Sequence, residues 1–128
     1  GAGGGGAGGV GGTNSGSGGG IPGVGGDGVA NSITGTSVTY ARGGAGGNFT
    51  NSLHHPNDAG GSANDGLGNG GGGAYSTGAP NSGSDGVVII SYISTSPIFS
   101  GGTITNYTSG SDTYQVHKFT SNGTLVGT

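Results

Sequence analysis

Apolar residues along this chain gather in a few short clusters separated by long glycine-rich stretches, and the clusters predict β-strands. The most apolar cluster covers residues 86–93, which read Gly-Val-Val-Ile-Ile-Ser-Tyr-Ile. A short, continuous apolar run that begins after a glycine is typical of a buried strand. Because both faces of this segment are apolar, we expect it to be a central strand that is covered on both sides.

Four shorter segments are rich in the β-branched and aromatic residues that strands favour. Residues 32–40 surround a glycine and predict a hairpin. Residues 104–107 and 114–119 predict a second hairpin with its turn near 109–112, and residues 124–126 predict a final short strand. No segment shows the periodicity of an amphipathic helix over a useful length. The expected fold class is therefore all-β, a small β-sheet or sandwich with essentially no α-helix.

Between the clusters, glycine recurs with a period of three. Residues 5–13 are consecutive Gly-Gly-X triplets, and the pattern returns over residues 43–48. The polyproline II helix has about three residues per turn and makes no internal hydrogen bonds. When two of every three residues lack a side chain, such helices can approach closely and bond to one another through their backbones. We expect polyglycine II segments of this kind, and the alternative is a flexible Gly/Ser linker.

Composition narrows the functions that are open to the chain. Glycine supplies 38 of 128 residues, charged residues only 5%, and cysteine is absent. Arg42 and Lys118 are the only lysine or arginine residues, whereas nucleic-acid binding takes several cationic contacts to phosphates. No apolar stretch approaches the ~18–20 residues of a membrane span. We therefore expect neither nucleic-acid binding nor membrane insertion, and no disulfide.

The expected domain organisation is a single glycine-rich module over residues 1–128. Residues 1–85 would form extended glycine-rich segments with the short hairpin near 32–40, and residues 86–128 would form a β-strand region. Large apolar side chains are too few to offset the entropy lost by ordering so many glycines. Order would then come from backbone hydrogen bonds and from packing against other chains, which favours one repeat or subunit of a fibre.

Three segments carry a resemblance to a known type of sequence. Residues 86–92 match the pattern G-x-V-x-I-x-Y, and residues 117–126 form a segment that opens with H-x-F-T-S. These resemble the ending and the opening of glycine-rich domains in phage tail fibres and related bacterial surface proteins, and residues 31–40 are similar to a segment often seen between the two. The resemblance implies an extracellular location. Many members carry an arginine where this chain has Ser91, and no motif marks the receptor-contacting residues of the family, so none is transferred to this chain.

The order of these segments differs from the usual one. In the family the opening block precedes the glycine-rich tract, whereas here it comes last, so joining Thr128 to Gly1 would restore the usual order. We consider two hypotheses. The modules run in tandem along one polypeptide, or the C-terminal strands complete the next subunit of a filament.

No segment predicts a metal site, a cofactor site or a catalytic centre. Residues 60–68 resemble one calcium-binding nonapeptide, but a single copy lacks the neighbouring turn that completes the coordination. His54 and His55 would point to opposite sides of an extended segment, which makes them poor joint ligands. The aspartates lie in turn contexts, no strand-to-helix nucleophile elbow is present, and His117 is expected on the surface of a strand. We therefore expect no enzyme activity.

Three sequons are candidate acceptors of N-linked glycans. They begin at Asn48, Asn106 and Asn122. In a chain so rich in asparagine, serine and threonine, chance alone also produces such sequons, and this remains the alternative.

The function expected from these observations is structural. The chain would be a subunit or repeat of an extracellular fibre, assembled from copies of itself by strand and glycine-helix packing, because a strand left at an edge recruits another chain. The alternative is a receptor- or carbohydrate-binding adhesin tip of a phage tail fibre, in which loops 53–58 and 74–84 bind cell-surface glycans and Tyr40 and Tyr75 stack on sugars. The residues expected to form strands between subunits are Val87, Val88, Ile89, Ile90, Tyr92, Phe119, Leu125 and Val126.

Overall fold

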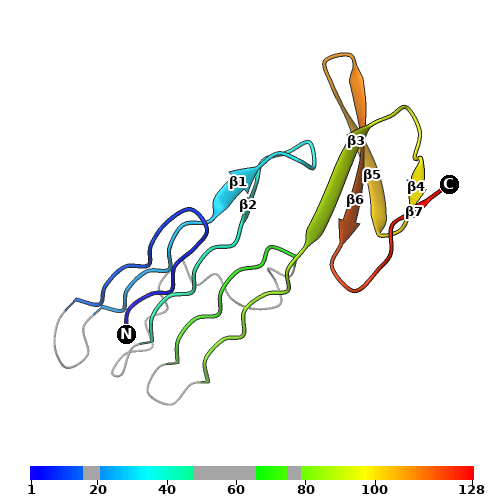
Figure 1. Cartoon of the computed structure of the whole chain (residues 1–128). Helices are drawn as coiled ribbons and strands as arrows, with labels where there is room; N and C mark the ends of the chain where they lie inside the picture. The colour runs from blue at the N-terminus through cyan, green and yellow to red at the C-terminus, as the bar shows by residue number, and fades with distance from the viewer. Residues whose placement is uncertain (16–20, 48–65, 75–78) are drawn as a thin grey trace. The chain divides into compact units, whose positions relative to one another are not determined.

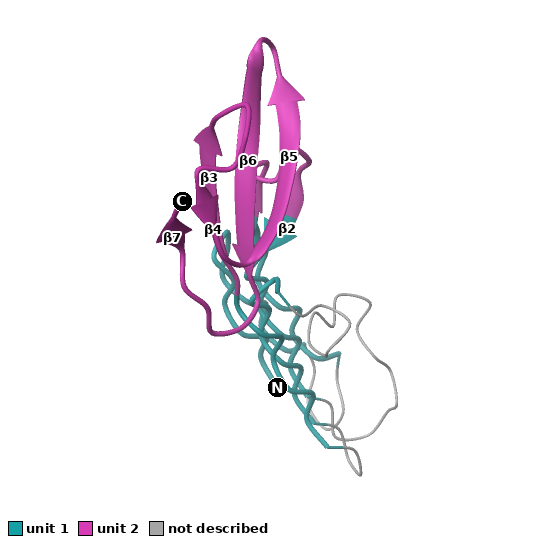
Figure 2. Cartoon of the chain, turned by 90° about the vertical axis from the view of Figure 1, so that its right-hand side faces the viewer, with its two compact units in different colours: residues 1–29, 39–86 teal, residues 30–38, 87–128 magenta. Residues whose placement is uncertain are grey.

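A computed structural model describes residues 1–15, 21–47, 66–74 and 79–128, which divide into two compact units (Figures 1 and 2). The first unit comprises residues 1–29 and 39–86, and the second comprises residues 30–38 and 87–128. All regular secondary structure in the described ranges is β-strand, arranged in small sheets, and none is helix. The all-β fold class expected from the sequence is therefore confirmed.

The second unit contains a three-stranded antiparallel sheet. Its strands are β3 (Val88–Ile93), β5 (Thr103–Ser109) and β6 (Asp112–Phe119). They lie in the order β3–β6–β5, which Figure 2 shows face-on. The prediction that residues 86–93 form a central strand is wrong, because β6 lies in the middle and β3 lies at an edge. Connectivity is the reason that β3 is not central: a tight turn makes β5 and β6 neighbours, so β3 cannot lie between them, and it pairs with the outer side of β6.

The hairpin predicted around residues 109–112 is confirmed by β5 and β6. Ser109 lies opposite Asp112 across a two-residue turn. Gly110 in this turn has a φ of 62°, the left-handed value that the primed hairpin turns require at their first position. Because the turn sets the register, Tyr107 lies opposite Tyr114, and their rings stack with centroids 5.0 Å apart.

Two short ribbons complete the set of strands. The hairpin predicted over residues 32–40 is present, but its first strand lies before Ser32 and only the second falls inside the predicted range. The final strand predicted over 124–126 overlaps the observed one only at Val126. The ribbons are β1 (Val29–Asn31) with β2 (Val38–Tyr40), and β4 (Phe99–Ser100) antiparallel to β7 (Val126–Gly127).

The core of the second unit lies along β6. The exposed fractions of Gln115, Val116 and His117 are 2%, 1% and 0%, and successive residues of a strand point to opposite faces of its sheet. Both faces of β6 are therefore covered. Gly35, in the turn after β1, has a φ of 89°, and a Cβ there would lie only 2.6 Å from Cγ of Tyr107. This turn thus packs closely against the sheet, and only glycine fits at that position.

Backbone hydrogen bonds in the first unit join glycine-rich runs at every third residue. These runs are the extended segments that Figure 1 draws side by side, and they include residues 1–7, 21–28, 42–47 and 69–74. The spacing of three is the spacing of the glycine pattern in the sequence. The bonds run from the N–H of Gly23 to the carbonyl of Gly1, Gly26 to Gly4, Gly43 to Gly26, Gly46 to Gly23, Gly70 to Arg42 and Gly73 to Ala45.

The runs approach so closely that several glycines have no room for a side chain. A Cβ at Gly26 would overlap the carbonyl oxygen of Gly9, and a Cβ at Gly43 would overlap that of Gly4. At Gly5, by contrast, the nearest atom would be the Gly9 carbonyl oxygen at 3.9 Å, an ordinary van der Waals distance. Glycine is therefore required at the positions that face a neighbouring run, here called the inner sides of the runs. It is not required at every position of a run.

A buried asparagine links two of the glycine-rich segments. Asn69 is 4% exposed, and its side-chain Oδ1 accepts a hydrogen bond from the N–H of Arg42 at 2.9 Å. The backbone N–H of Asn69 donates to Oγ of Ser84 at 2.7 Å, and its carbonyl accepts from the N–H of Ser84 at 2.9 Å. The side chain of Asn69 thus satisfies the backbone N–H of Arg42, and its backbone groups bond to Ser84.

Candidate assembly surface

β3 has one paired edge and one open edge. The N–H of Ser94, directly after β3, donates to the carbonyl of Thr113 at 2.9 Å. Ser94 and Thr113 therefore form a hydrogen-bonded pair. Because hydrogen-bonded and non-hydrogen-bonded pairs alternate in an antiparallel sheet, the even-numbered residues of β3 bond to β6 and the odd-numbered residues do not. The backbone N–H and C=O groups of Ile89, Ser91 and Ile93 point away from β6, to an edge at which no strand of the described ranges pairs.

The open edge of β3 lacks the features that normally protect edges. Natural edge strands usually carry charged residues, proline or a bulge, which discourage pairing with another chain. β3 contains neither a charged residue nor a proline. Val88 and Ile93 at its two ends are 59% and 61% exposed. In the described part of the chain, this edge of β3 is therefore apolar and carries neither a charge nor a proline.

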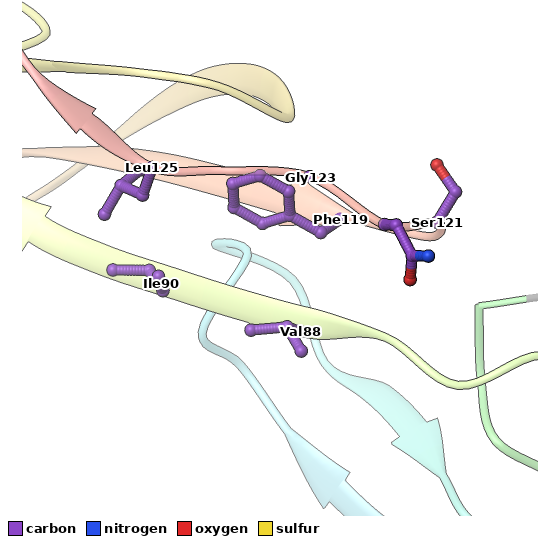
Figure 3. A pocket seen from close by; sticks show the side chains of 7 residues that line it. Val88, Ile90, Phe119, Ser121, Gly123 and Leu125 are labelled. Atoms are coloured by element: carbon purple, nitrogen blue, oxygen red, sulfur yellow. The ribbon is translucent and has the colours of Figure 1, made fainter.

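A groove of about 440 Å³ lies beside β3 on one face of the sheet (Figure 3). Val88 and Ile90 line it from β3, and Phe119 lines it from the end of β6, where it lies opposite Val88 in the register. Leu125 reaches it from the segment before β7. Four of the residues predicted to join subunits are thus brought together. The rest of the lining is Ser121, Asn122 and Gly123.

The other four predicted subunit-joining residues lie outside the groove. Val87 is half-buried directly before β3, and Ile89 points to the opposite face of the sheet because side chains alternate. Tyr92 is turned toward the core, and Val126 lies in β7 opposite Ser100.

His117 is completely buried, so the prediction that it lies on the surface is wrong. Its Nδ1 lies 2.8 Å from the carbonyl oxygen of Gly101, which can only accept, so this nitrogen carries a proton and donates it. In the neutral ring, Nε2 then accepts from the hydroxyl of Tyr92 at 3.1 Å. The same hydroxyl accepts from the N–H of Ile98 at 3.1 Å. The segment after β3 therefore folds back over the histidine, a cover that no local pattern in the sequence reveals.

Two further polar groups of the sheet were not identified from the sequence. The side-chain Nε2 of Gln115 donates to the carbonyl of Ser94 at 3.0 Å. Oγ of Ser91 is buried and has no hydrogen-bond partner among the described residues. Ser91 was visible as the single hydroxyl between Ile90 and Tyr92, but nothing local to the strand showed that the hydroxyl is buried.

The candidate glycosylation sites are only partly placed by the structure. Asn106 is exposed on β5, and Asn122 is exposed at the groove. Asn48 lies outside the described residues.

The candidate ligand and glycan-binding positions also lie largely outside the described residues. Tyr40 is described and lies half-buried on β2. The positions outside the described residues are His54, His55, Tyr75, the whole of loop 53–58, residues 75–78 of loop 74–84 and residues 60–65 of the calcium-like segment.

The parts of the chain that the structure describes contain no group of three or more histidine, cysteine, aspartate or glutamate residues that is arranged to hold a metal ion. In the same parts, no helix has the length and apolar character needed to cross a membrane.

Comparison with known proteins found no match. No family model, no curated protein and no solved structure matches this chain. Its function has to be inferred from its own geometry.

Proposed function

We propose that this chain is a structural module of an extracellular fibre, and that its glycine-rich runs are packed polyglycine II helices. The observation that carries the proposal is the recurrence of hydrogen bonds between runs at every third residue. A polyproline II-type helix has about three residues per turn, so every third residue faces the same neighbour. A β-strand instead directs its backbone groups alternately to two sides.

The run 42–47 supports this assignment because its successive residues serve different neighbours. The N–H groups of Gly43 and Gly46 donate to the run 21–28. The carbonyls of residues 42 and 45 accept from the run 69–74, and the carbonyl of Gly44 accepts from Gly4. Three neighbours served in rotation is the behaviour of a threefold helix.

Hydrogen bonds also connect three of the runs in a cycle. Gly4 donates to the carbonyl of Gly44, Gly43 donates to that of Gly26, and Gly26 donates back to that of Gly4. Each of these runs is thereby bonded to both of the others. Such a network satisfies backbone groups in the interior without requiring large apolar side chains. It would give a stiff shaft with little charge, as a fibre module needs.

The open edge of β3 and the adjoining groove supply the means of joining modules. An unprotected apolar edge recruits another strand, and a groove beside it can hold side chains of that strand. The extracellular placement rests on the resemblance of residues 86–92 and 117–121 to glycine-rich domains of phage tail fibres and bacterial surface proteins. We assign no catalytic activity to the chain.

Negative-stain electron microscopy of the purified chain, before and after mild protease treatment, tests the proposal. We expect uniform filaments that survive digestion, because packed extended backbone offers few flexible sites for cleavage. The Gly5→Ala variant, with room for its methyl group, should form the same filaments. Discrete particles without any polymer would contradict the fibre function.

A second candidate function is that of a receptor- or carbohydrate-binding tip. The groove favours it, because ligand sites are typically concave and mostly apolar with a few polar groups, and Ser121 and Asn122 supply such groups here. Binding of the chain to cell-surface glycans as a discrete oligomer, with no filaments, would favour this function over the first.

A further inference from the structure

We propose that Tyr107 and Tyr114 form a site of oxidative modification, at which a one-electron oxidant joins their two phenol rings into an intramolecular dityrosine. The oxidant is hydrogen peroxide acting through a haem peroxidase. The site lies within the three-stranded sheet of the second unit and does not depend on whether the chain forms a fibre. It gives a chain without cysteine a means of forming a covalent bond between two strands.

The register of the sheet places the two tyrosines directly beside each other. Tyr107 of β5 lies opposite Tyr114 of β6, so both side chains stand on the same face of the sheet, with Cβ atoms about 4.5–5.5 Å apart. The rings are nearly parallel, with an angle of 5° between their planes and their centroids 5.0 Å apart. Neither ring therefore has to leave the sheet to reach the other.

The surroundings of Tyr107 restrict the motion of its ring. The turn after β1 lies so close that a Cβ at Gly35 would be 2.6 Å from Cγ of Tyr107 and 2.9 Å from its Cδ1. The ring of Tyr114 stacks on the same side chain. Two groups held in place in this way react as if each were present at a high concentration beside the other. We therefore expect coupling within one chain to be faster than coupling between chains.

Access and ring contacts single out this pair among the described tyrosines. Tyr107 and Tyr114 are half-buried, so part of each phenol remains open to a small oxidant. The ring of Tyr92 instead lies against Phe99 and His117, neither of which is a phenol. Tyr40 belongs to the first unit. Two described phenols are thus in ring contact only at Tyr107 and Tyr114.

The coupling reaction is balanced by one molecule of peroxide. Each phenol loses one electron and its hydroxyl proton, which gives a phenoxyl radical whose unpaired electron is shared with the ring carbons next to the C–O bond. The two radicals combine through one such carbon on each ring and form a carbon–carbon bond. Each of these carbons then releases its hydrogen as a proton, and the two oxygens are protonated again. In total, the chain loses two hydrogen atoms and hydrogen peroxide is reduced to two molecules of water.

Mass spectrometry of the full chain, treated with a haem peroxidase and hydrogen peroxide, tests the site. The expected product is lighter by two hydrogen atoms. Cleavage before aspartate cuts the chain at Asp112, between Tyr107 and Tyr114, so only a cross-link keeps the two peptides joined. In an equal mixture of unlabelled and heavy-isotope-labelled chain, joined peptides should carry one isotope only. Joined peptides of mixed isotopes, or none at all, would overturn the proposal.

The variant Tyr107→Phe removes one phenol and keeps its ring. Because phenylalanine does not form a phenoxyl radical, this variant should lose the joined peptides while the hairpin remains folded. The matched control Tyr40→Phe, at another half-buried tyrosine, should give them in the yield of the unmodified chain. An unchanged yield in Tyr107→Phe would show that a different residue couples to the second peptide, which contradicts the assigned pair.

A double variant tests whether the register directs the coupling. Tyr107→Phe combined with Thr105→Tyr keeps the number of tyrosines and moves the phenol to an exposed position on the same face of β5. There it lies diagonal to Tyr114, about 7–8 Å away, because Thr105 is opposite Val116. The yield of joined peptides should fall several-fold. A yield equal to that of the unmodified chain would overturn the assignment of the site to the stacked pair.

Discussion

At the scale of single residues, the glycines of the first unit divide into two kinds. Those on the inner sides of the runs, such as Gly26 and Gly43, lie against the backbone of a neighbouring run. Others, such as Gly5, have room for a Cβ, which would make only an ordinary van der Waals contact. The two kinds are indistinguishable in the sequence, because both occur within the same Gly-Gly-X pattern. Only the inner glycines are required by the packing.

A pair of alanine substitutions tests this division. Gly26→Ala should lower the free energy of unfolding by at least about 2 kcal/mol, because its methyl group meets backbone atoms that cannot move aside. Gly5→Ala should change it by no more than about 0.5 kcal/mol, since an exposed glycine replaced by alanine loses less entropy on folding. Chemical denaturation of both variants measures the difference. Equal stabilities would mean that the runs do not pack as closely as described.

The buried pair of Tyr92 and His117 makes a second prediction at this scale. Tyr92→Phe should destabilise the chain by about 1–2 kcal/mol, because Nε2 of the buried histidine loses its hydrogen-bond partner. Tyr107→Phe is the matched control, since its ring keeps its stack on Tyr114 and its effect should stay within about 0.5 kcal/mol. Thermal unfolding followed by near-ultraviolet circular dichroism compares the two. A neutral Tyr92→Phe would show that the hydroxyl contributes nothing to stability.

At the scale of elements, the two units obtain their hydrogen bonds in different ways. In the second unit, β6 bonds to a strand on each side, and its residues alternate between the two partners. In the first unit, donors of a run recur at every third residue, as at Gly23 and Gly26 or at Gly43 and Gly46. The period of the bonding is therefore two in one unit and three in the other.

Amide hydrogen exchange should report these two periods. In the runs 21–28 and 42–47, we expect slow exchange at Gly23, Gly26, Gly43 and Gly46, because their N–H groups donate to the backbone of a neighbouring run, and faster exchange at the residues between them. Arg42 should also be protected, because its N–H donates to Oδ1 of Asn69. Nuclear magnetic resonance resolves the individual amides. Protection at every second residue would indicate β-strands, and uniform fast exchange would indicate a linker.

At the scale of the whole molecule, the interior is unusual in its chemistry. Among the described residues, Ala45 and Val116 are the only hydrophobic residues that are almost fully buried. The buried polar side chains Asn69, Gln115 and His117 outnumber them. Burial in this chain therefore concerns backbone and polar groups to a larger extent than in ordinary domains, which bury mostly apolar side chains.

This interior predicts a small heat-capacity change on unfolding. Exposure of apolar surface raises the heat capacity and exposure of polar surface lowers it, with a usual net value of about 12–15 cal/mol/K per residue. We expect a value well below this range, because unfolding exposes mostly backbone. Differential scanning calorimetry of the chain measures it. A value within the usual range would contradict this description of the interior.

Local sequence features were sufficient for some of the fold. The absence of helical periodicity predicted an all-β chain, and the turn residues near 109–112 predicted the hairpin of β5 and β6. The apolar character of residues 86–93 predicted a strand there, and β3 covers most of this range. These predictions succeeded because propensity and turn geometry act within a few residues of the chain.

Only the tertiary structure decided how these segments are used. Strand order left β3 at an edge, because the tight turn between β5 and β6 makes these two strands neighbours and keeps β3 from lying between them. The pairing of β3 with β6 made β6 the central strand. The fold of residues 98–101 over the sheet buried His117, and packing around β3 buried the hydroxyl of Ser91 without a partner among the described residues. The sequence by itself therefore determined which segments are extended and where the three-residue glycine pattern occurs. Burial and open edges depend on segments distant in sequence that meet only in the folded chain.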